Sequence, residues 1–290
     1  MDWESVDERL IRRGELLLSL EFLEGYDREL KSMDSGKIGC PHKLTESYVE
    51  SLPVVRYLFF MPYRQLEGFT RALNRLVPKL PSADYSGLRR RILGLDHSLH
   101  EPLRVSDGPI VVAVDSTGVS VHKSGGWVER KHGKKKKHIK IHLAVDVETK
   151  RGLSMLVTTD GTHDSRAFPE LLSKAETHRK VSKIIADGAY DSSKVYELLE
   201  KKGIDAVIKP RRNSRLDTPS QPRRKAVTLY KHLGHKRWEK LKGYGKRWSV
   251  ETAYSTFKRA FGESCMAKTF QNVKKELATK ALIYNMLINL

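Results

Sequence analysis

The first hundred residues place apolar side chains at helical spacing, interrupted by polar segments. The first such pattern ends near Gly25 and contains six apolar residues: Leu10, Ile11, Leu17, Leu18, Leu20 and Phe22. Residues three and four apart share one face of an α-helix, so this spacing predicts a helix. The segment from Lys31 to Lys43 holds two glycines and a proline and is expected to form a loop.

Two further helical patterns run from Arg64 to Leu76 and from Tyr85 to Leu95. Asp84 or Ser82 is the expected N-cap of the second helix. Two helices joined by a short connection are typical of DNA-binding helix-turn-helix motifs, but such pairs occur in many helical domains. If the pair binds DNA, the side chains that suit the contact are Arg89, Arg90 and Arg91.

From residue 109 the period changes from helix to strand. Ile110–Val114 is a continuous apolar run, as expected of a strand buried on both faces, and Asp115 follows at its end. The later segments are predicted as strand His138–Val145, strand Leu153–Thr159, helix Ser165–His178, strand Val181–Ala186, helix Ser192–Lys201 and strand Ala206–Ile208. This order predicts an antiparallel meander followed by parallel strands, which makes the fold class α/β with a mixed sheet.

The change of period divides the chain into a helical N-terminal region, residues 1–105, and an α/β region, residues 106–290. Within the second region, residues 210–242 contain three prolines and two basic clusters but little periodic apolar pattern. We expect a basic insertion or long loop there, which either follows a nucleic acid or is a disordered, solvated loop. The apolar segment Val273–Leu290 is expected to be a helix that packs against the sheet.

Four polar residues near the C-terminus share one face of an expected helix. Tyr244, Arg247, Glu251 and Lys258 fall within roughly 60° of one another at 100° per residue. One carboxylate flanked by an arginine, a lysine and a phenol suits a site for a metal and a phosphate. Because Asp115 also follows a strand pattern, as does Asp187, the sequence predicts three carboxylates from three elements in one site.

Charge supports a polyanionic partner. The formal net charge is +19, and residues 1–105 carry 16 basic against 16 acidic side chains, so the whole excess lies in residues 106–290. Such a charge attracts DNA or RNA and makes binding depend on salt, although it also suits a merely solubilising surface. The chain has no apolar run of 18 residues and only two cysteines, so we expect no membrane span and a cytoplasmic location.

The spacing Tyr244-x2-Arg247-x3-Glu251-x6-Lys258 resembles the Y-R-E-K signature of the DDE transposases of bacterial and archaeal insertion sequences, families four and five. The resemblance covers most of the chain from about residue 60 onward. Further segments that resemble the family are Val114–Thr117, Ala186–Asp191, Gly161–Ser165 and Tyr63–Phe69.

The resemblance implies a ribonuclease-H-like fold in which Asp115, Asp187 and Glu251 are catalytic and hold two Mg²⁺ or Mn²⁺ ions. Arg247 and Lys258 would hold phosphates of the transposon ends, with Tyr244 beside them. The family hydrolyses DNA at the element end and directs the freed 3′-hydroxyl at a target phosphodiester. The implied partners are double-stranded DNA, as transposon ends and target, and a second copy of the chain, because pairing two ends needs at least a homodimer.

Some roles have two interpretations. Trp248 either stacks on an unpaired base or packs in the core, and its place in an amphipathic helix favours the core. His163 and Asp164 lie either near the metals or at the start of the following helix as a cap, which we favour. The basic run Lys131–Lys137 either grips phosphates or forms a solvated hairpin tip. Two other functions also fit: a metal-dependent nuclease or resolvase without strand transfer, and a non-catalytic DNA-binding relative.

Overall fold

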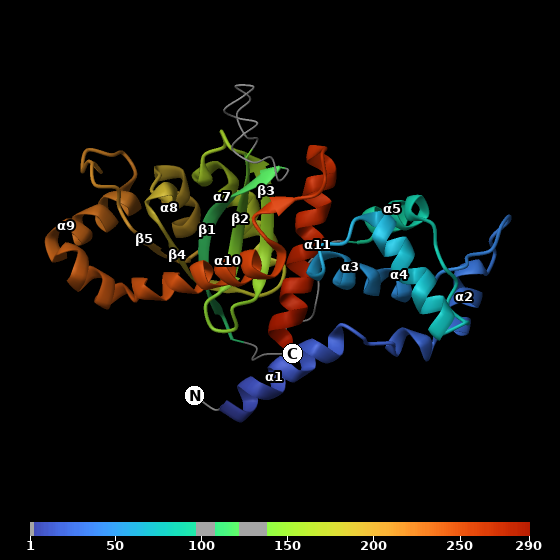
Figure 1. Cartoon of the computed structure of the whole chain (residues 1–290). Helices are drawn as coiled ribbons and strands as arrows, with labels where there is room; N and C mark the ends of the chain where they lie inside the picture. The colour runs from blue at the N-terminus through green and yellow to red at the C-terminus, as the bar shows by residue number, and fades with distance from the viewer. Residues whose placement is uncertain (1–2, 97–107, 122–137) are drawn as a thin grey trace, which may run out of the picture. The chain divides into compact units, whose positions relative to one another are not determined.

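The structure is a computed structural model that describes residues 3–96, 108–121 and 138–290. It divides into two compact units, one formed by Met1–His97 with Thr269–Leu290 and the other by Ser98–Lys268 (Figure 1). The C-terminal segment therefore belongs with the N-terminal helices, whereas the change of sequence period assigns it to the α/β region. Within the described parts of the chain, we find no helix with the length and apolar character needed to cross a bilayer.

The first unit is helical. Its elements are α1 Trp3–Leu16, the 3₁₀ helix η1 Glu21–Leu23, α2 Tyr26–Asp34, α3 Glu46–Leu58, α4 Tyr63–Leu76, α5 Tyr85–Gly94 and α11 Phe270–Asn289. Tyr48 of α3, Leu66 of α4 and Leu88 of α5 meet in one buried apolar cluster. The two helices expected from the periodic pattern are α4 and α5, and Asp84 caps α5 by accepting hydrogen bonds from the N–H groups of Ser86 and Gly87.

Other parts of this unit differ from the prediction. α1 ends at Leu16 rather than near Gly25, and α2 occupies the start of the expected loop Lys31–Lys43. α3 was not predicted, because Pro53 lies inside it and interrupts the pattern. α11 contacts α3 and α5, where the sequence pattern predicts that it packs against the sheet.

The second unit is built on a mixed sheet with strand order β3-β2-β1-β4-β5, and β6 pairs with β1. The strands are β1 Ile110–Val121, β2 His138–Asp146, β3 Gly152–Thr159, β4 Val181–Ala186, β5 Asp205–Ile208 and β6 Ser264–Cys265. β1 pairs antiparallel with β2, and β2 with β3, whereas β4 runs parallel to β1 and to β5. The predicted meander followed by parallel strands is therefore confirmed; among the strands of the described residues, the two-residue β6 is the one that was missed.

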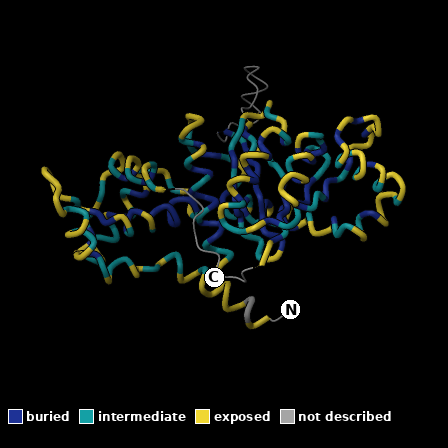
Figure 2. The backbone as a smooth tube through the Cα atoms, turned by 180° about the vertical axis from the view of Figure 1, so that it is seen from behind, coloured by how far each residue is buried: buried dark blue, intermediate teal, exposed yellow. Residues whose placement is uncertain are grey.

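Helices cover the sheet of this unit. They are α7 Asp164–Glu176, the 3₁₀ helix η2 Gly188–Tyr190, α8 Ser193–Lys201, α9 Gln221–Lys242, the 3₁₀ helix η3 Tyr244–Arg247 and α10 Trp248–Phe261. Phe168 of α7 and Leu199 of α8 share a buried core with Val112 and Val114 of β1. The strands therefore lie in the buried interior of the unit, drawn dark blue in Figure 2.

The segment expected as a loop at residues 210–242 is mostly helical. α9 spans 22 residues and bends at Gly234, whose φ of 70° is outside the helical range. Pro222 lies in the first turn of α9, where a missing N–H removes no helical hydrogen bond, so this proline starts the helix instead of breaking it. The expectation of a loop over the whole segment is wrong for this reason.

Candidate active site

Two aspartates meet at one point of the sheet because of strand register. Val114 of β1 pairs with Ala186 at the end of parallel β4, so Asp115 and Asp187 follow paired residues. β1 continues to Val121, which corrects the expectation that Asp115 ends its strand. The chain turns at Asp187, whose side chain accepts a hydrogen bond from Ala189 N at 2.9 Å. The register thus brings together two acids that lie 72 positions apart in the sequence.

Arg247 links Asp115 to Glu251. Its Nη1 lies 3.1 Å from Asp115 Oδ2, and its Nη2 pairs with Glu251 Oε1. Arg247 ends the 3₁₀ turn η3 and Glu251 lies in the first turn of α10, so the four-residue stripe spans two kinds of helix and not one continuous α-helix. The i, i+4 spacing still puts the guanidinium beside the Glu251 carboxylate.

The carboxyl group of Asp115 sits in an environment that disfavours its charge. Burial, the largest cause, raises its pKa from 3.8 to about 6. The carboxylates of Asp187 and Glu251 act in the same direction, whereas the N–H of Ser116 and the guanidinium of Arg247 oppose them. A cation beside these carboxylates would remove the repulsion between them.

The arrangement suits a hard divalent cation in its chemistry, because carboxylate oxygens are the ligands that Mg²⁺ and Mn²⁺ prefer. Among the described residues, however, no three His, Cys, Asp or Glu side chains are gathered closely enough to hold a metal. Arg247 holds oxygens of both Asp115 and Glu251. The guanidinium therefore competes with a cation for these two oxygens.

Two other residues of the stripe differ in their surroundings. Tyr244 is buried, its ring lies 5.1 Å from that of Trp238, and desolvation raises its pKa to about 12, so the phenol remains protonated at neutral pH. The Arg247 guanidinium lies 5.9 Å from the Tyr244 ring centre. Lys258 lies on α10, two turns after Glu251, and its Nζ is 3.4 Å from Glu263 Oε1. Tyr244 is thus placed to support Arg247, whereas the Lys258 ammonium lies near the surface.

Trp248 is exposed, which contradicts the favoured prediction that it packs in the core. Its relative exposure is 58%, and Lys150 Nζ lies 5.2 Å from the ring centre. Trp248 follows Arg247 directly, at the start of α10. The alternative interpretation, stacking on an unpaired base, requires an exposed ring and stays a prediction.

The turn after Asp187 is fastened by the segment that precedes α9. Arg211 donates hydrogen bonds to the carbonyl oxygens of Gly188 and Ala189. Asp191 is buried and pairs with Arg223 of α9 at 2.7 Å. The basic segment therefore has a structural role at the active site, in addition to any contact with nucleic acid.

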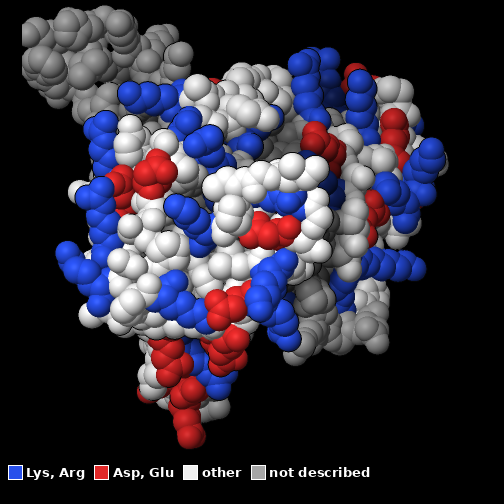
Figure 3. All heavy atoms as spheres, turned by 90° about the vertical axis from the view of Figure 1, so that its right-hand side faces the viewer, with Lys and Arg blue, Asp and Glu red and all other residues white. Residues whose placement is uncertain are grey.

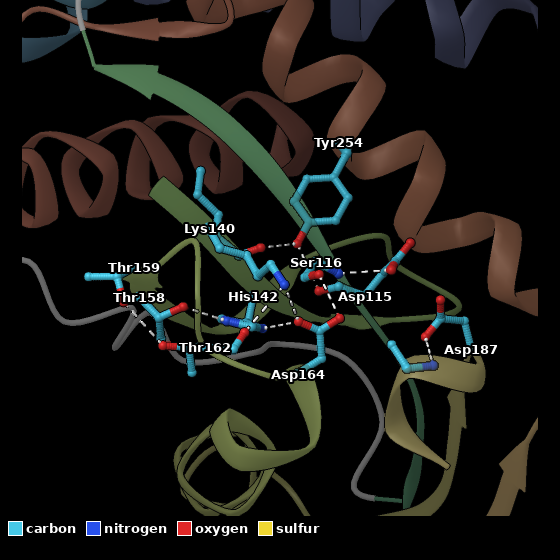
Figure 4. Close-up of polar contacts among 12 residues, drawn as sticks. Asp115, Ser116, Lys140, His142, Thr158, Thr159, Thr162, Asp164, Asp187 and Tyr254 are labelled. Atoms are coloured by element: carbon cyan, nitrogen blue, oxygen red, sulfur yellow. Dashed lines mark hydrogen bonds and ion pairs between the residues drawn. The ribbon is translucent and has the colours of Figure 1, made fainter. Parts of the chain in front are cut away.

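The sequence pattern missed a polar network beside Asp115 (Figure 4). Asp164 is buried and accepts hydrogen bonds from Ser116 Oγ and Lys140 Nζ. Tyr254 of α10 donates from its hydroxyl to the carbonyl oxygen of Asp115 at 2.9 Å. His163 occupies the N-cap position of α7 but makes no side-chain cap hydrogen bond, so the favoured capping role is wrong.

The arginines of α5 in the helical unit are not equivalent. Arg89 and Arg90 are exposed, whereas Arg91 donates to the carbonyl of Leu44 and pairs with Glu46. Arg91 is therefore held by internal partners. On the face drawn in Figure 3, basic and acidic side chains are interspersed. The basic run Lys131–Lys137 lies outside the described residues.

A mixed sheet with one carboxylate inside β1, a second directly after the parallel neighbour β4 and a third on α10 is the arrangement expected of a ribonuclease-H-like domain. A family model described as a transposase DDE domain matches residues 106–286, and a second model with the same description matches residues 11–124. The first match covers more than half of the chain. The chain therefore belongs to the transposase DDE-domain family, and it is an enzyme that cuts and transfers DNA strands.

Solved structures of transposase complexes are distant matches. The chain is 12% identical to the piggyBac transposase of a synaptic complex with hairpin DNA. The match covers 96% of this chain and 74% of that one, with a TM-score of 0.43. For the Mos1 strand transfer complex the identity is 12%, the coverage 93% and 83%, and the TM-score 0.34. For the Drosophila P element transposase strand transfer complex these values are 13%, 90% and 70%, and 0.35.

Proposed function

We propose that Asp115, Asp187 and Glu251 are the catalytic carboxylates of this transposase and hold two divalent ions, Mg²⁺ or Mn²⁺. One observation carries the proposal: parallel register brings Asp115 and Asp187 to one point of the sheet, and Arg247 connects Asp115 to Glu251. When bound, such ions activate a water or a 3′-hydroxyl and stabilise the leaving oxygen of a phosphodiester.

The residues around the carboxylates would bind and orient the DNA. Arg247 offers a planar guanidinium that suits phosphate oxygens, and Lys258 on α10 offers a point charge about three turns further along. Tyr244, which is buried, would keep the guanidinium of Arg247 in place. Because phosphoryl transfer requires mainly positioning and neutralisation of charge, these contacts supply what the reaction needs from the protein.

The reaction would act on the ends of an insertion sequence of the kind marked by the Y-R-E-K spacing. The partners would be double-stranded DNA, as transposon ends and as target, and a second copy of the chain in the active complex, acting in the cytoplasm on chromosomal DNA. In the helical unit, Arg89 and Arg90 are exposed on α5 and remain the candidates for DNA contact, whereas Arg91 has internal partners.

The test of this proposal is the substitution Glu251→Gln, which keeps the size of the side chain but removes its charge. Cleavage of a DNA containing the element end, measured in Mg²⁺, should fall by at least about a thousandfold while the fold is retained. Glu170→Gln on α7, an exposed carboxylate paired with Lys174, is the matched control. Full cleavage by the Glu251→Gln variant would show that the assignment of the carboxylates is wrong.

A second assay separates the transposase from a nuclease. A pre-cleaved element end and a supercoiled plasmid are incubated with the natural protein and Mg²⁺. Joining of the end to the plasmid is the expected result, and it should be absent with Asp115→Asn. Cutting without joining would favour a nuclease or resolvase, and DNA binding without either reaction would favour a non-catalytic relative.

A further inference from the structure

The residues Asp115 and Ser116 lie side by side in β1 but point to opposite faces of the sheet, because side chains alternate along a strand. Val112 and Val114 belong to the core that contains α7, and Ser116 continues their row. Asp115 points to the other face, where it meets Arg247. A contact to Ser116 from the α7 face can therefore act on Asp115 through the strand.

Asp164, the first residue of α7, makes such a contact (Figure 4). Its Oδ2 accepts a hydrogen bond from Ser116 Oγ at 2.9 Å, and its Oδ1 accepts one from Lys140 Nζ at 3.0 Å. His142 of β2 is fully buried, and its Nδ1 lies 3.7 Å from Asp164 Oδ1. The buried carboxylate is thus held by groups from two other elements, β1 and β2.

This cluster exceeds what the start of a helix requires. An acidic residue in the first turn of a helix is favourable when it is exposed to solvent, and it needs no buried partners. A buried carboxylate, by contrast, is tolerated only when it is paired and hydrogen-bonded. The ammonium of Lys140 and the hydroxyl of Ser116 meet that need for Asp164. The arrangement therefore fixes the orientation of Ser116.

Ser116 carries this constraint to Asp115. Its backbone N–H donates to Asp115 Oδ1 at 2.8 Å, while its hydroxyl is held by Asp164. On the other face of the sheet, the hydroxyl of Tyr254 donates to the carbonyl oxygens of Asp115 and Ile141, at 2.9 and 3.0 Å. The Asp115 residue is thereby restrained from both faces.

We propose that Asp164 is a positioning residue for Asp115: by fixing Ser116 from the far face of the sheet, it holds the Asp115 carboxylate in the orientation in which that carboxylate binds the catalytic cation. The inference rests on the proposed function, since it concerns a metal ligand. Groups that orient a ligand from outside the coordination sphere commonly change metal affinity by about 10- to 100-fold.

The experiment measures the affinity of the DNA-free protein for Mn²⁺ alone, by electron paramagnetic resonance of the free ion. Asp164→Asn should weaken Mn²⁺ binding by about tenfold, and Ser116→Ala, which keeps the N–H, should weaken it by a similar factor. Because both act through one path, the double variant should be no weaker than Asp164→Asn alone. On the element-end substrate, kcat should fall while KM for the DNA stays unchanged.

The matched control is Asp146→Asn, a buried carboxylate of β2 that accepts hydrogen bonds from Glu148 N and Thr149 Oγ1 in the following turn. It should leave Mn²⁺ affinity unchanged. Unchanged affinity in both Asp164→Asn and Ser116→Ala, or losses that add independently in the double variant, would overturn the inference. If Asp164→Asn does not fold, Tyr254→Phe takes its place in the comparison. Tyr254 contacts Asp115 from the other face of the sheet. The double variant Tyr254→Phe with Ser116→Ala should therefore bind Mn²⁺ more weakly than Ser116→Ala alone.

Asp115→Asn separates this inference from the proposed function. If Asp115→Asn itself leaves Mn²⁺ binding unchanged, the assignment of the metal ligand fails. If Asp115→Asn abolishes binding whereas the variants of Asp164 and Ser116 do not weaken it, only the positioning role fails.

Discussion

The Nη1 atom of Arg247 lies 3.1 Å from Oδ2 of Asp115, and the same guanidinium pairs with Glu251. A positive side chain thus lies between two of the carboxylates that we propose as metal ligands. If the same guanidinium holds a DNA phosphate in the active complex, it cannot at once hold both carboxylates. Binding of metal and binding of DNA are then coupled through one side chain. A phosphate that binds Arg247 takes the guanidinium away from the carboxylates, and a cation on the carboxylates displaces it from them.

Substitution of Arg247 by alanine should therefore have opposite effects on the two ligands. Without DNA, Mn²⁺ affinity should rise several-fold, because the competing cation is removed from Asp115 and Glu251. Binding to the element end should weaken, and the slope of log affinity against log salt should become shallower by about one unit. Isothermal titration with Mn²⁺ and fluorescence anisotropy over a series of salt concentrations measure the two effects.

Arg259→Ala is the control for the metal measurement, since Arg259 is an exposed arginine of α10, the helix that follows Arg247. It should leave Mn²⁺ affinity unchanged. A fall in Mn²⁺ affinity in Arg247→Ala would mean that the guanidinium supports the carboxylates and does not compete with the metal. An unchanged salt slope would remove the phosphate role of Arg247.

Asp115→Asn should stabilise the metal-free protein at neutral pH. The carboxyl pKa is raised from 3.8 to about 6, which corresponds to about 3 kcal/mol of folding free energy. Because the folded pKa is the higher one, the protonated group favours the fold below pH 4, and this contribution is lost as pH rises through 6. The stability difference between Asp115→Asn and the natural protein should accordingly grow from near zero at pH 4 to about 3 kcal/mol at pH 7.5.

Urea unfolding in the presence of a chelator measures that difference. A constant difference between Asp115→Asn and the natural protein over this range would show that the Asp115 carboxyl titrates near its ordinary value.

The sheet could be predicted from the sequence because its strands carry the pattern of buried strands. The segment Val181–Ala186 agrees with β4 at both ends, since a short apolar run bounded by polar residues has few other interpretations. Prolines obscured both α3 and α9, and in α9 the scarcity of periodic apolar residues added to this. Proline usually indicates the end of a helix. Pro53 nevertheless lies inside α3, and Pro222 lies in the first turn of α9.

The active site could be predicted only in part. Helical periodicity places Arg247 and Glu251 side by side, because that contact is local. The role of Asp164 depends on where α7 packs and on the partners that β1 and β2 offer, and a single sequence contains no record of such contacts. Trp248 shows the same limit, because amphipathic spacing does not tell whether a neighbouring element covers the start of a helix.

Breaking the buried pair between Asp191 and Arg223 should destabilise the catalytic unit. Asp191 has no exposed side-chain surface and the side chain of Arg223 is 14% exposed, so Arg223→Met leaves a buried carboxylate without its cation. The expected loss is about 3–5 kcal/mol in the free energy of unfolding. The control is Lys202→Met, which removes a pair with Glu176 near the surface and should cost no more than about 1 kcal/mol. Equal losses in the two variants, measured by urea unfolding, would contradict this account.

Trp248→Ala should reduce binding of DNA with an unpaired base at the element end, without affecting stability. The exposed indole lies beside Arg247, where a base that leaves the duplex next to a held phosphate could stack on it. Stacking of one base on an aromatic ring contributes about 1–3 kcal/mol, so affinity for this DNA should fall roughly tenfold, whereas affinity for the fully paired end should stay the same. Trp238→Phe, at a buried tryptophan, should give the reverse result: lower stability and unchanged discrimination between the two DNAs. Equal weakening of both DNAs by Trp248→Ala, in anisotropy titrations, would assign the indole to the duplex and not to an unpaired base.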